Sequence, residues 1–194
     1  MPVVLASTSP YRRRLLARLQ LPFQCDSPGV EESIRPGEGP ADRALRLALE
    51  KAQAVAARHP ASLVIGSDQV ASIGDRVIRK PGCFDAALEQ LRASSGRAVS
   101  FHTAVAIICS DRSVRESHVE LFRVHFRQLD DITITRYLER EEPYDCAGSF
   151  KWESLGIALF SRMEGDDPTS LEGLPLIALT GLLERAGHPV LGPS

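Results

Sequence analysis

The sequence predicts an α/β fold, with α+β as the alternative, in which helices flank a mixed β-sheet. Short apolar runs typical of strands alternate along the chain with segments in which apolar residues recur every three to four positions, as in amphipathic helices. The chain has 194 residues, 43% of them hydrophobic, which is enough to bury an ordinary core. We therefore expect one domain over residues 1–194, arranged as two lobes around a cleft.

The chain opens on a strand that leads directly into a helix. Residues 3–5 are the apolar start, Ser9 is typical of a helix N-cap, and Pro10 is typical of the first helical position. Leucines spaced three and four residues apart then form the apolar face of this helix. A second helix is predicted over about 40–58, after a loose segment at 28–40.

The middle of the chain continues the alternation of strands and helices. The segment SLVIGSDQV, residues 62–70, predicts a short apolar strand that ends in a polar turn, and a helix is expected over about 84–93. Residues 98–109 and 118–129 have β character and are separated by a charged turn. These two runs therefore predict a long hairpin.

The end of the chain carries two further helix signals. Asp130 or Asp131 is suited to cap a helix, because an aspartate side chain accepts hydrogen bonds from the free N–H groups of the first turn. The last helix is predicted over about 174–185.

Composition and charge argue against several classes of protein. A net charge of −2 and 6% aromatic content do not suit a protein that binds nucleic acid through its backbone. The four cysteines lie far apart, which argues against a zinc site or a disulfide framework and fits a reducing compartment. No apolar run approaches the roughly 20 residues needed to span a bilayer. We therefore expect a cytoplasmic protein with no stable nucleic-acid complex and no membrane association.

Three consecutive arginines, residues 12–14, occupy the first turn of the N-terminal helix, where the helix dipole disfavours cations. Arg12 continues the apolar face of this helix, so its guanidinium needs an anion there. One interpretation is a phosphate bound by Arg12, the helix N-terminus and the hydroxyls of Ser7 and Ser9. The other is an internal carboxylate. The remaining two arginines point elsewhere on the helix and are expected in solvent.

Other charged residues leave two interpretations when each is taken alone. Asp68 follows a buried strand, where α/β proteins place ligand-binding carboxylates, but an Asx-turn that ends the strand fits equally. Lys51 flanks the apolar face of the second predicted helix, and Lys80 precedes a proline. Each of these lysines, like Glu32 in the loose segment, is by itself typical of a surface charge.

Eight segments in order along the chain resemble the Maf family of nucleoside triphosphate pyrophosphatases. They are LASTSPYRRRLL, VEES, ALEKA, IGSDQV, KPG, SSGRAVSFHT, EEPYDCAGSF and DDPTSLEGLPL. The resemblance implies a fold similar to that of inosine triphosphate pyrophosphatases. It also implies a hydrolase acting on acid anhydrides, which cleaves a nucleotide between its α and β phosphates with the help of a divalent cation.

The resemblance gives roles to the residues that match these segments. Asp68 is implied as the catalytic residue, and the implied phosphate-binding residues are Ser7, Ser9, Arg12, Lys51 and Lys80. Glu32 and Asp68 are the candidates for holding Mg²⁺ or Mn²⁺, since hard cations prefer oxygen ligands. Whether Asp68 is the base for the attacking water, a metal ligand or both stays open. The family resemblance also implies a homodimer.

Three departures from the commoner family pattern resemble the branch that acts on 7-methylguanosine triphosphate and removes modified nucleotides from the pool. They are Tyr11, Gln69 and Glu153. Tyr11 would stack on the cationic methylated guanine, and Glu153 would accept hydrogen bonds from its N1–H and N2–H groups. The alternatives are a pyrophosphatase that prefers dTTP, UTP or other modified nucleotides, and a non-catalytic regulator that senses nucleotides.

Overall fold

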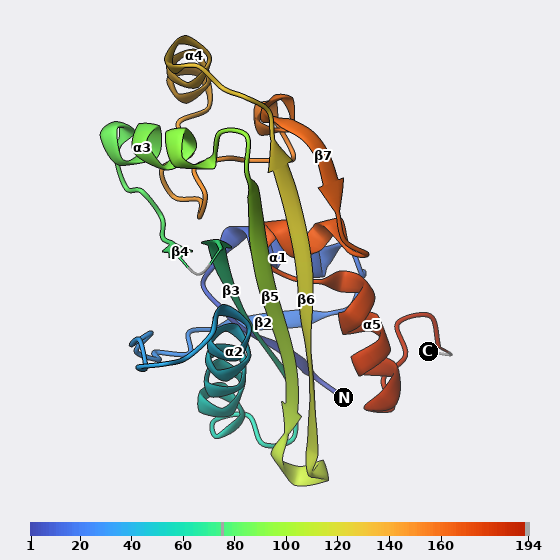
Figure 1. Cartoon of the computed structure of the whole chain (residues 1–194). Helices are drawn as coiled ribbons and strands as arrows, with labels where there is room; N and C mark the ends of the chain where they lie inside the picture. The colour runs from blue at the N-terminus through green and yellow to red at the C-terminus, as the bar shows by residue number, and fades with distance from the viewer. Residues whose placement is uncertain (75, 193–194) are drawn as a thin grey trace. The chain divides into compact units, whose positions relative to one another are not determined.

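The architecture of the computed structural model, which describes residues 1–74 and 76–192, confirms the predicted α/β class (Figure 1). The strands pair in the order β2-β1-β3-β5-β6-β7, with β4 paired to β3. The sheet is mixed, because β1 pairs in parallel with β2 and β3 while β4 and β7 pair antiparallel. The chain divides into two compact units, the first formed by Met1–Gln69, His102–Glu120 and Asp166–Ser194 and the second by Val70–Phe101 and Leu121–Gly165. A single domain with a cleft between lobes stays a prediction.

Three long or central strands contribute residues to both units: β3 (Leu63–Ile73), β5 (Ala98–Cys109) and β6 (Val114–Phe126). The other elements of the first unit are β1 (Val3–Ala6), α1 (Pro10–Ala17), β2 (Phe23–Asp26), α2 (Pro40–Ala56), η1 (Ser110–Arg112), η3 (Pro168–Glu172) and α5 (Leu176–Arg185). Those of the second unit are β4 (Arg76–Ile78), α3 (Phe84–Ser94), α4 (Asp131–Glu141), η2 (Leu155–Leu159) and β7 (Phe160–Glu164).

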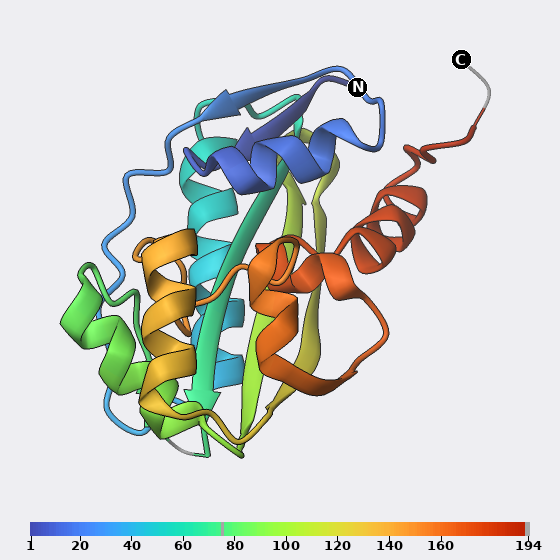
Figure 2. The ribbon, with the colours of Figure 1, turned by 90° about the horizontal axis from the view of Figure 1, so that it is seen from above.

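The main core of the first unit joins α1 and α5 to the strands β1, β3 and β5. Its fully buried members include Leu5, Leu16, Ile65, Ile107 and Leu179. Figure 2 shows α1 beside the first strands, and Figure 1 shows α2 and α5 on opposite sides of the sheet. Because helices cover both of its faces here, β3 is apolar over a continuous run rather than at alternate positions.

The core of the second unit is aromatic. Four phenylalanine rings, with centroids 4.8 to 5.7 Å apart, meet edge to face: Phe101, Phe126, Phe150 and Phe160. Edge-to-face contacts of this kind add about 0.5–1.5 kcal/mol each beyond the burial of the rings. Helices α3 and α4 pack against each other in the same unit (Figure 1).

Most of the predicted elements are confirmed. The N-cap of α1 is Ser9, whose hydroxyl accepts from the N–H of Arg12 (3.4 Å), and the N-cap of α4 is Asp130. The long hairpin is formed by β5 and β6. The sequence did not predict the short strands β2, β4 and β7. Strands β2 and β7 depend on pairing with strands distant in the sequence, whereas β4 pairs with the adjacent β3. No helix in the described part of the chain has the length and apolar character needed to cross a membrane.

Candidate active site

The strand β3 carries the central residues of the candidate site at alternate positions. Successive side chains of a strand point to opposite faces of the sheet, so Gly66 and Asp68 share one face and Ser67 and Gln69 share the other. The first face meets α2, and the second meets β5 and η3. Asp68 therefore lies inside the strand, which continues to Ile73, and the expected turn at this position is wrong.

Helix α2 approaches β3 closely because residue 66 is glycine. A Cβ atom there would collide with the carbonyl oxygen of Ala48 and would lie 2.7 Å from the backbone nitrogen of Ala52. Lys51 belongs to the same buried face of α2, three residues after Ala48 and one before Ala52. The close approach brings a lysine from an apolar helix face against the middle of a buried strand.

Lys51 joins two carboxylates in this site. Its Nζ donates to Oδ1 of Asp68 (2.6 Å) and to Oε1 of Glu32 (2.5 Å). The side chains of Lys51 and Asp68 are only 7% and 8% exposed, whereas that of Glu32 is 53% exposed. The structure therefore brings together three of the predicted site residues, with Glu32 at the solvent side of the cluster.

Burial sets the ionisation of Asp68. Removal of the carboxylate from water raises its pKa above the usual aspartate value, and the negative charge of Glu32 acts in the same direction. Lys51 and Arg12 oppose this shift without cancelling it. A carboxylate with a raised pKa, fixed by a lysine, has the properties expected of a general base.

Arg12 is held by a backbone carbonyl rather than by the internal carboxylate that was one of its two interpretations. Its Nε donates to the carbonyl oxygen of Gly173 (2.8 Å), and Nη1 and Nη2 donate no hydrogen bond to any atom of residues 1–74 and 76–192. Burial lowers the pKa of Arg12, whereas the charges of Asp68 and Glu32 raise it. The guanidinium is therefore oriented through one nitrogen, with its other N–H groups left to bind an anion.

The two serines lie where the turn from β1 enters α1. Ser7 is buried, and its hydroxyl accepts from the N–H of Ser9 (3.1 Å). The Ser9 hydroxyl in turn caps α1. Both hydroxyls thus have local structural partners in this loop, and each retains the capacity to donate its own O–H to an anion.

Three supporting contacts of the site were not predicted from the sequence. Ser67 is fully buried, and its hydroxyl lies 2.8 Å from both the Ala104 and Gly173 carbonyl oxygens. Gly173 has a φ of 103°, which favours glycine, and it places this carbonyl between Ser67 and Arg12. The segment DDPTSLEGLPL singles out this region, but its spacing gives no sign that a carbonyl within it orients Arg12.

Gln69, a predicted specificity residue, is fixed by its amide nitrogen. Its Nε2 donates to the hydroxyl of Thr103 (3.0 Å) and to the carbonyl oxygen of Ser170 (2.7 Å). These bonds join β3 to β5 and η3. A contact of Gln69 with a substrate would therefore use Oε1, which is an acceptor.

Tyr11 contacts a cation within the protein. The guanidinium of Arg14 lies 5.3 Å from the centroid of the Tyr11 ring, within the range of a cation–π interaction. Arg14 also pairs with Glu172 (3.1 Å), and its side chain stays 59% exposed, as expected. Arg13 is exposed, as expected.

The remaining two predicted residues belong to the second unit. Lys80 is exposed in the loop between β4 and α3, and Glu153 is exposed in the segment that leads into η2. The roles predicted for them stay predictions, whereas Arg12, Lys51, Glu32, Gln69 and Asp68 are all placed within the first unit.

The carboxylates of Glu32 and Asp68 fit a hard divalent cation, since both already share one cationic group. In the described residues there is no group of three or more His, Cys, Asp or Glu side chains suited to a metal ion. Two carboxylates completed by substrate phosphates and water are a usual environment for Mg²⁺. The donor set thus fits a divalent cation whose other ligands are phosphate oxygens and water.

The chain is similar over almost its whole length to curated relatives. It is 57% identical over 191 residues to a 7-methyl-GTP pyrophosphatase of Bordetella pertussis, with 98% of this chain and 95% of the relative covered. It is 52% identical over 189 residues to a protein of the same name from Nitrosococcus oceani, covering 97% and 95%. A third relative with this name, from Pseudomonas syringae pv. tomato, is 52% identical over 188 residues, covering 97% and 98%.

Solved structures support the fold. The Ham1 protein of Staphylococcus aureus aligns with a TM-score of 0.54 at 12% identity, covering 96% of this chain and all of that one. A HAM1 protein from Coxiella burnetii aligns with a TM-score of 0.50 at 15% identity, covering 95% and 99%. The sequence profile of the Maf-like proteins matches residues 2–186. With this match and relatives above 50% identity, the chain belongs to the Maf family.

Proposed function

We propose that this protein hydrolyses the bond between the α and β phosphates of 7-methylguanosine triphosphate. Water is consumed, and 7-methyl-GMP and diphosphate are released. The observation that carries the proposal is that the buried Lys51 binds both Asp68 and Glu32. The same unit contains Arg12, which Gly173 orients through Nε and whose other N–H groups are able to bind an anion. The names of relatives that are 52–57% identical supply the substrate.

The cations of the site bind the triphosphate. Arg12, oriented by Gly173, donates from its remaining N–H groups to phosphate oxygens, and the hydroxyls of Ser7 and Ser9 add further donors. Lys51 neutralises negative charge that develops as the anhydride bond breaks. For Lys80, phosphate binding stays the role predicted from the sequence.

Asp68 takes the proton from the attacking water. Its raised pKa makes it a stronger base than an ordinary aspartate, and Lys51 fixes the orientation of the carboxylate. When bound, Mg²⁺ or Mn²⁺ supplies positive charge to the phosphate oxygens, and Glu32 and Asp68 are the residues that would hold it.

Recognition of the base uses Tyr11, Gln69 and Glu153. Methylation at N7 makes guanine cationic, and the Tyr11 ring already accepts one cation, Arg14, against its π-system. Glu153 offers only acceptors, which match the N1–H and N2–H donors of guanine, and Oε1 of Gln69 is a further acceptor. A homodimeric state and a cytoplasmic location belong to the same proposal.

Product analysis tests the proposed reaction. The purified protein is incubated with Mg²⁺ or Mn²⁺ and 7-methyl-GTP, GTP, dTTP or UTP, and diphosphate and orthophosphate are measured separately. We expect diphosphate and 7-methyl-GMP to form fastest from 7-methyl-GTP and Asp68→Asn to abolish the reaction. Asp111→Asn, at an exposed aspartate in η1, is the matched control and should retain full activity. Nucleotide binding without turnover by the unmodified protein would contradict the enzyme and favour a sensor.

An exchange of two residues tests the specificity. Tyr11→Arg combined with Glu153→Gln should lower kcat/KM for 7-methyl-GTP and raise it for UTP or dTTP, because an arginine repels the cationic base and an amide can both donate and accept. An unchanged order of substrates in the double variant would show that these residues do not determine the specificity.

A further inference from the structure

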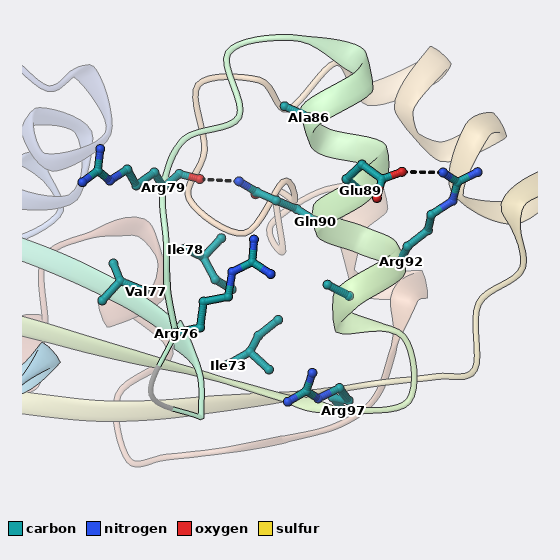
Figure 3. Close-up of a pocket in the computed structure, with 11 residues that line it drawn as sticks. Ile73, Arg76, Val77, Ile78, Arg79, Ala86, Glu89, Gln90, Arg92 and Arg97 are labelled. Carbon is teal, nitrogen blue, oxygen red and sulfur yellow. Dashed lines mark hydrogen bonds and ion pairs between the residues drawn. The ribbon is translucent and has the colours of Figure 1, made fainter.

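The second unit contains a cavity that takes no part in the proposed chemistry. It lies between the β3–β4 hairpin and α3 and has a volume of about 790 Å³ (Figure 3). Cavities of this size hold small organic ligands. Its lining combines apolar side chains with arginines, so it suits a ligand that has both an apolar part and a negative charge.

The register of the hairpin gives the cavity an apolar floor. In the antiparallel pair, Ile73 is opposite Arg76 and Ala71 is opposite Ile78, so these four side chains lie on one face of the hairpin. Ile73 and Ile78 are less than 10% exposed. Figure 3 shows Ile73, Arg76 and Ile78 directed toward α3, whose Ala86 lines the opposite wall. Small alanine side chains on the helix keep this wall open.

Two of the arginines in the lining present no free guanidinium group to the cavity. Arg92 donates to Glu89 (2.5 Å) and forms two hydrogen bonds with Asp131 (2.7 and 2.8 Å). The side chain of Arg79 extends away from the cavity in Figure 3, and its carbonyl accepts from Gln90 (2.8 Å). The negative charge of Glu89 is therefore balanced before any ligand binds.

Arg76 and Arg97 are different. Both line the cavity and are exposed, and within residues 1–74 and 76–192 neither side chain forms a hydrogen bond or an ion pair. Register with Ile73 fixes the backbone of Arg76. The carbonyl of Arg97 accepts from the N–H of Phe126 (2.9 Å), which fixes the start of β5. Two guanidinium groups, on residues whose backbone is held by pairing within the sheet, thus lie beside the apolar floor.

We propose that this cavity binds an organic anion that carries one negatively charged group on an aromatic or aliphatic body. The apolar body covers Ile73, Ile78 and Ala86, and the charged group binds Arg76 and Arg97. A free inorganic anion would not cover the apolar floor, and a neutral apolar molecule would leave the positive charges of the two arginines without a counter-ion. A nucleobase fits poorly, since Gln90 already uses its side-chain amide on Arg79 and Ser149.

Fluorescence binding tests this proposal with two probes that share an apolar body. The first is 8-anilinonaphthalene-1-sulfonate, and the second is N-phenyl-1-naphthylamine, which lacks the sulfonate. The sulfonate probe should bind the unmodified protein more tightly than the neutral probe. Arg76→Gln with Arg97→Gln should weaken the sulfonate probe by about tenfold or more, since charge-assisted hydrogen bonds are lost. The neutral probe should be unaffected by this change.

Two further variants locate the site. Arg136→Gln, at an exposed arginine of α4 outside the cavity, is the matched control and should bind the sulfonate probe normally. Ala86→Leu fills part of the cavity and should weaken both probes. Decanoate and decyl phosphate should displace the sulfonate probe and show which charged group is preferred, whereas inorganic phosphate should not. Equal binding of the sulfonate probe to all variants, or its displacement by inorganic phosphate alone, would overturn the proposal.

Discussion

The contact between α2 and β3 can be tested by adding a single methyl group at Gly66. In Gly66→Ala, the new Cβ would collide with the carbonyl of Ala48 and lie 2.8 Å from the Cβ of Ala52, where ordinary contacts are 3.4–4 Å. Two of the nearest atoms belong to the helix backbone, so no side-chain rotation relieves the overlap. The helix must move away by about 1 Å to restore ordinary contact with the Ala48 carbonyl.

This displacement has a cost in stability and a cost in activity. Overpacking of a tight core costs about 1–3 kcal/mol, which lowers Tm by roughly 2–12 °C for a protein of this length. Lys51 moves with the helix, and its contact with Asp68 is already at hydrogen-bond length (2.6 Å). Misplacement of a catalytic group by about 1 Å can lower the rate about 100-fold. Thermal melts and the diphosphate assay measure the two effects.

Two comparisons make this prediction specific. Gly181→Ala, in α5, places its Cβ no closer than 3.6 Å to the side chain of Arg185, and alanine favours a helix. This control should keep its activity and melt at an equal or higher temperature. Addition of Ala52→Gly to Gly66→Ala should not restore activity, because the collision with the Ala48 carbonyl persists. A Gly66→Ala protein with unchanged Tm and kcat would refute the proposed close packing.

Three other predictions concern the same unit. Lys51→Met should lower kcat by about 100- to 1000-fold in the diphosphate assay, because it removes a buried cation that stabilises developing charge. Burial raises the pKa of Asp68 in the folded state, so the folded protein holds this proton more tightly than the unfolded chain does. The free energy of unfolding should therefore fall as pH rises from the ordinary aspartate range through the raised pKa. Thermal melts of Asp68→Asn measured across the same pH range should lack this slope. Asp167→Ala should lower the free energy of unfolding by roughly 2–4 kcal/mol in urea titrations, because the buried carboxylate accepts hydrogen bonds at the starts of both η3 and α5.

Local patterns were sufficient to predict the longer elements of the fold. The bounds of α2 and α3 follow from apolar spacing, and the hairpin of β5 and β6 follows from two β-rich runs around a charged turn. The strands β2, β4 and β7 have only three to five residues each. Strands β2 and β7 form by pairing with β1 and β6, which lie far away in the sequence, and such pairing leaves little trace in segments of this length. Strand β4 pairs with the adjacent β3, but its three residues are too few to show the alternation typical of a strand.

The same distinction applies to the candidate site. Lys51 repeats the three- and four-residue spacing of the buried face of α2, so the sequence places it near the core and leaves open which anion it meets. Its partner Asp68 was also suited to a turn, because a polar run after three apolar residues marks the end of many strands. The strand continues instead because Ser67 and Gln69 form hydrogen bonds on one face while Gly66 admits α2 on the other. A polar stretch inside a buried strand is stable only when each polar group has such a partner, and those partners come from segments up to 106 residues away.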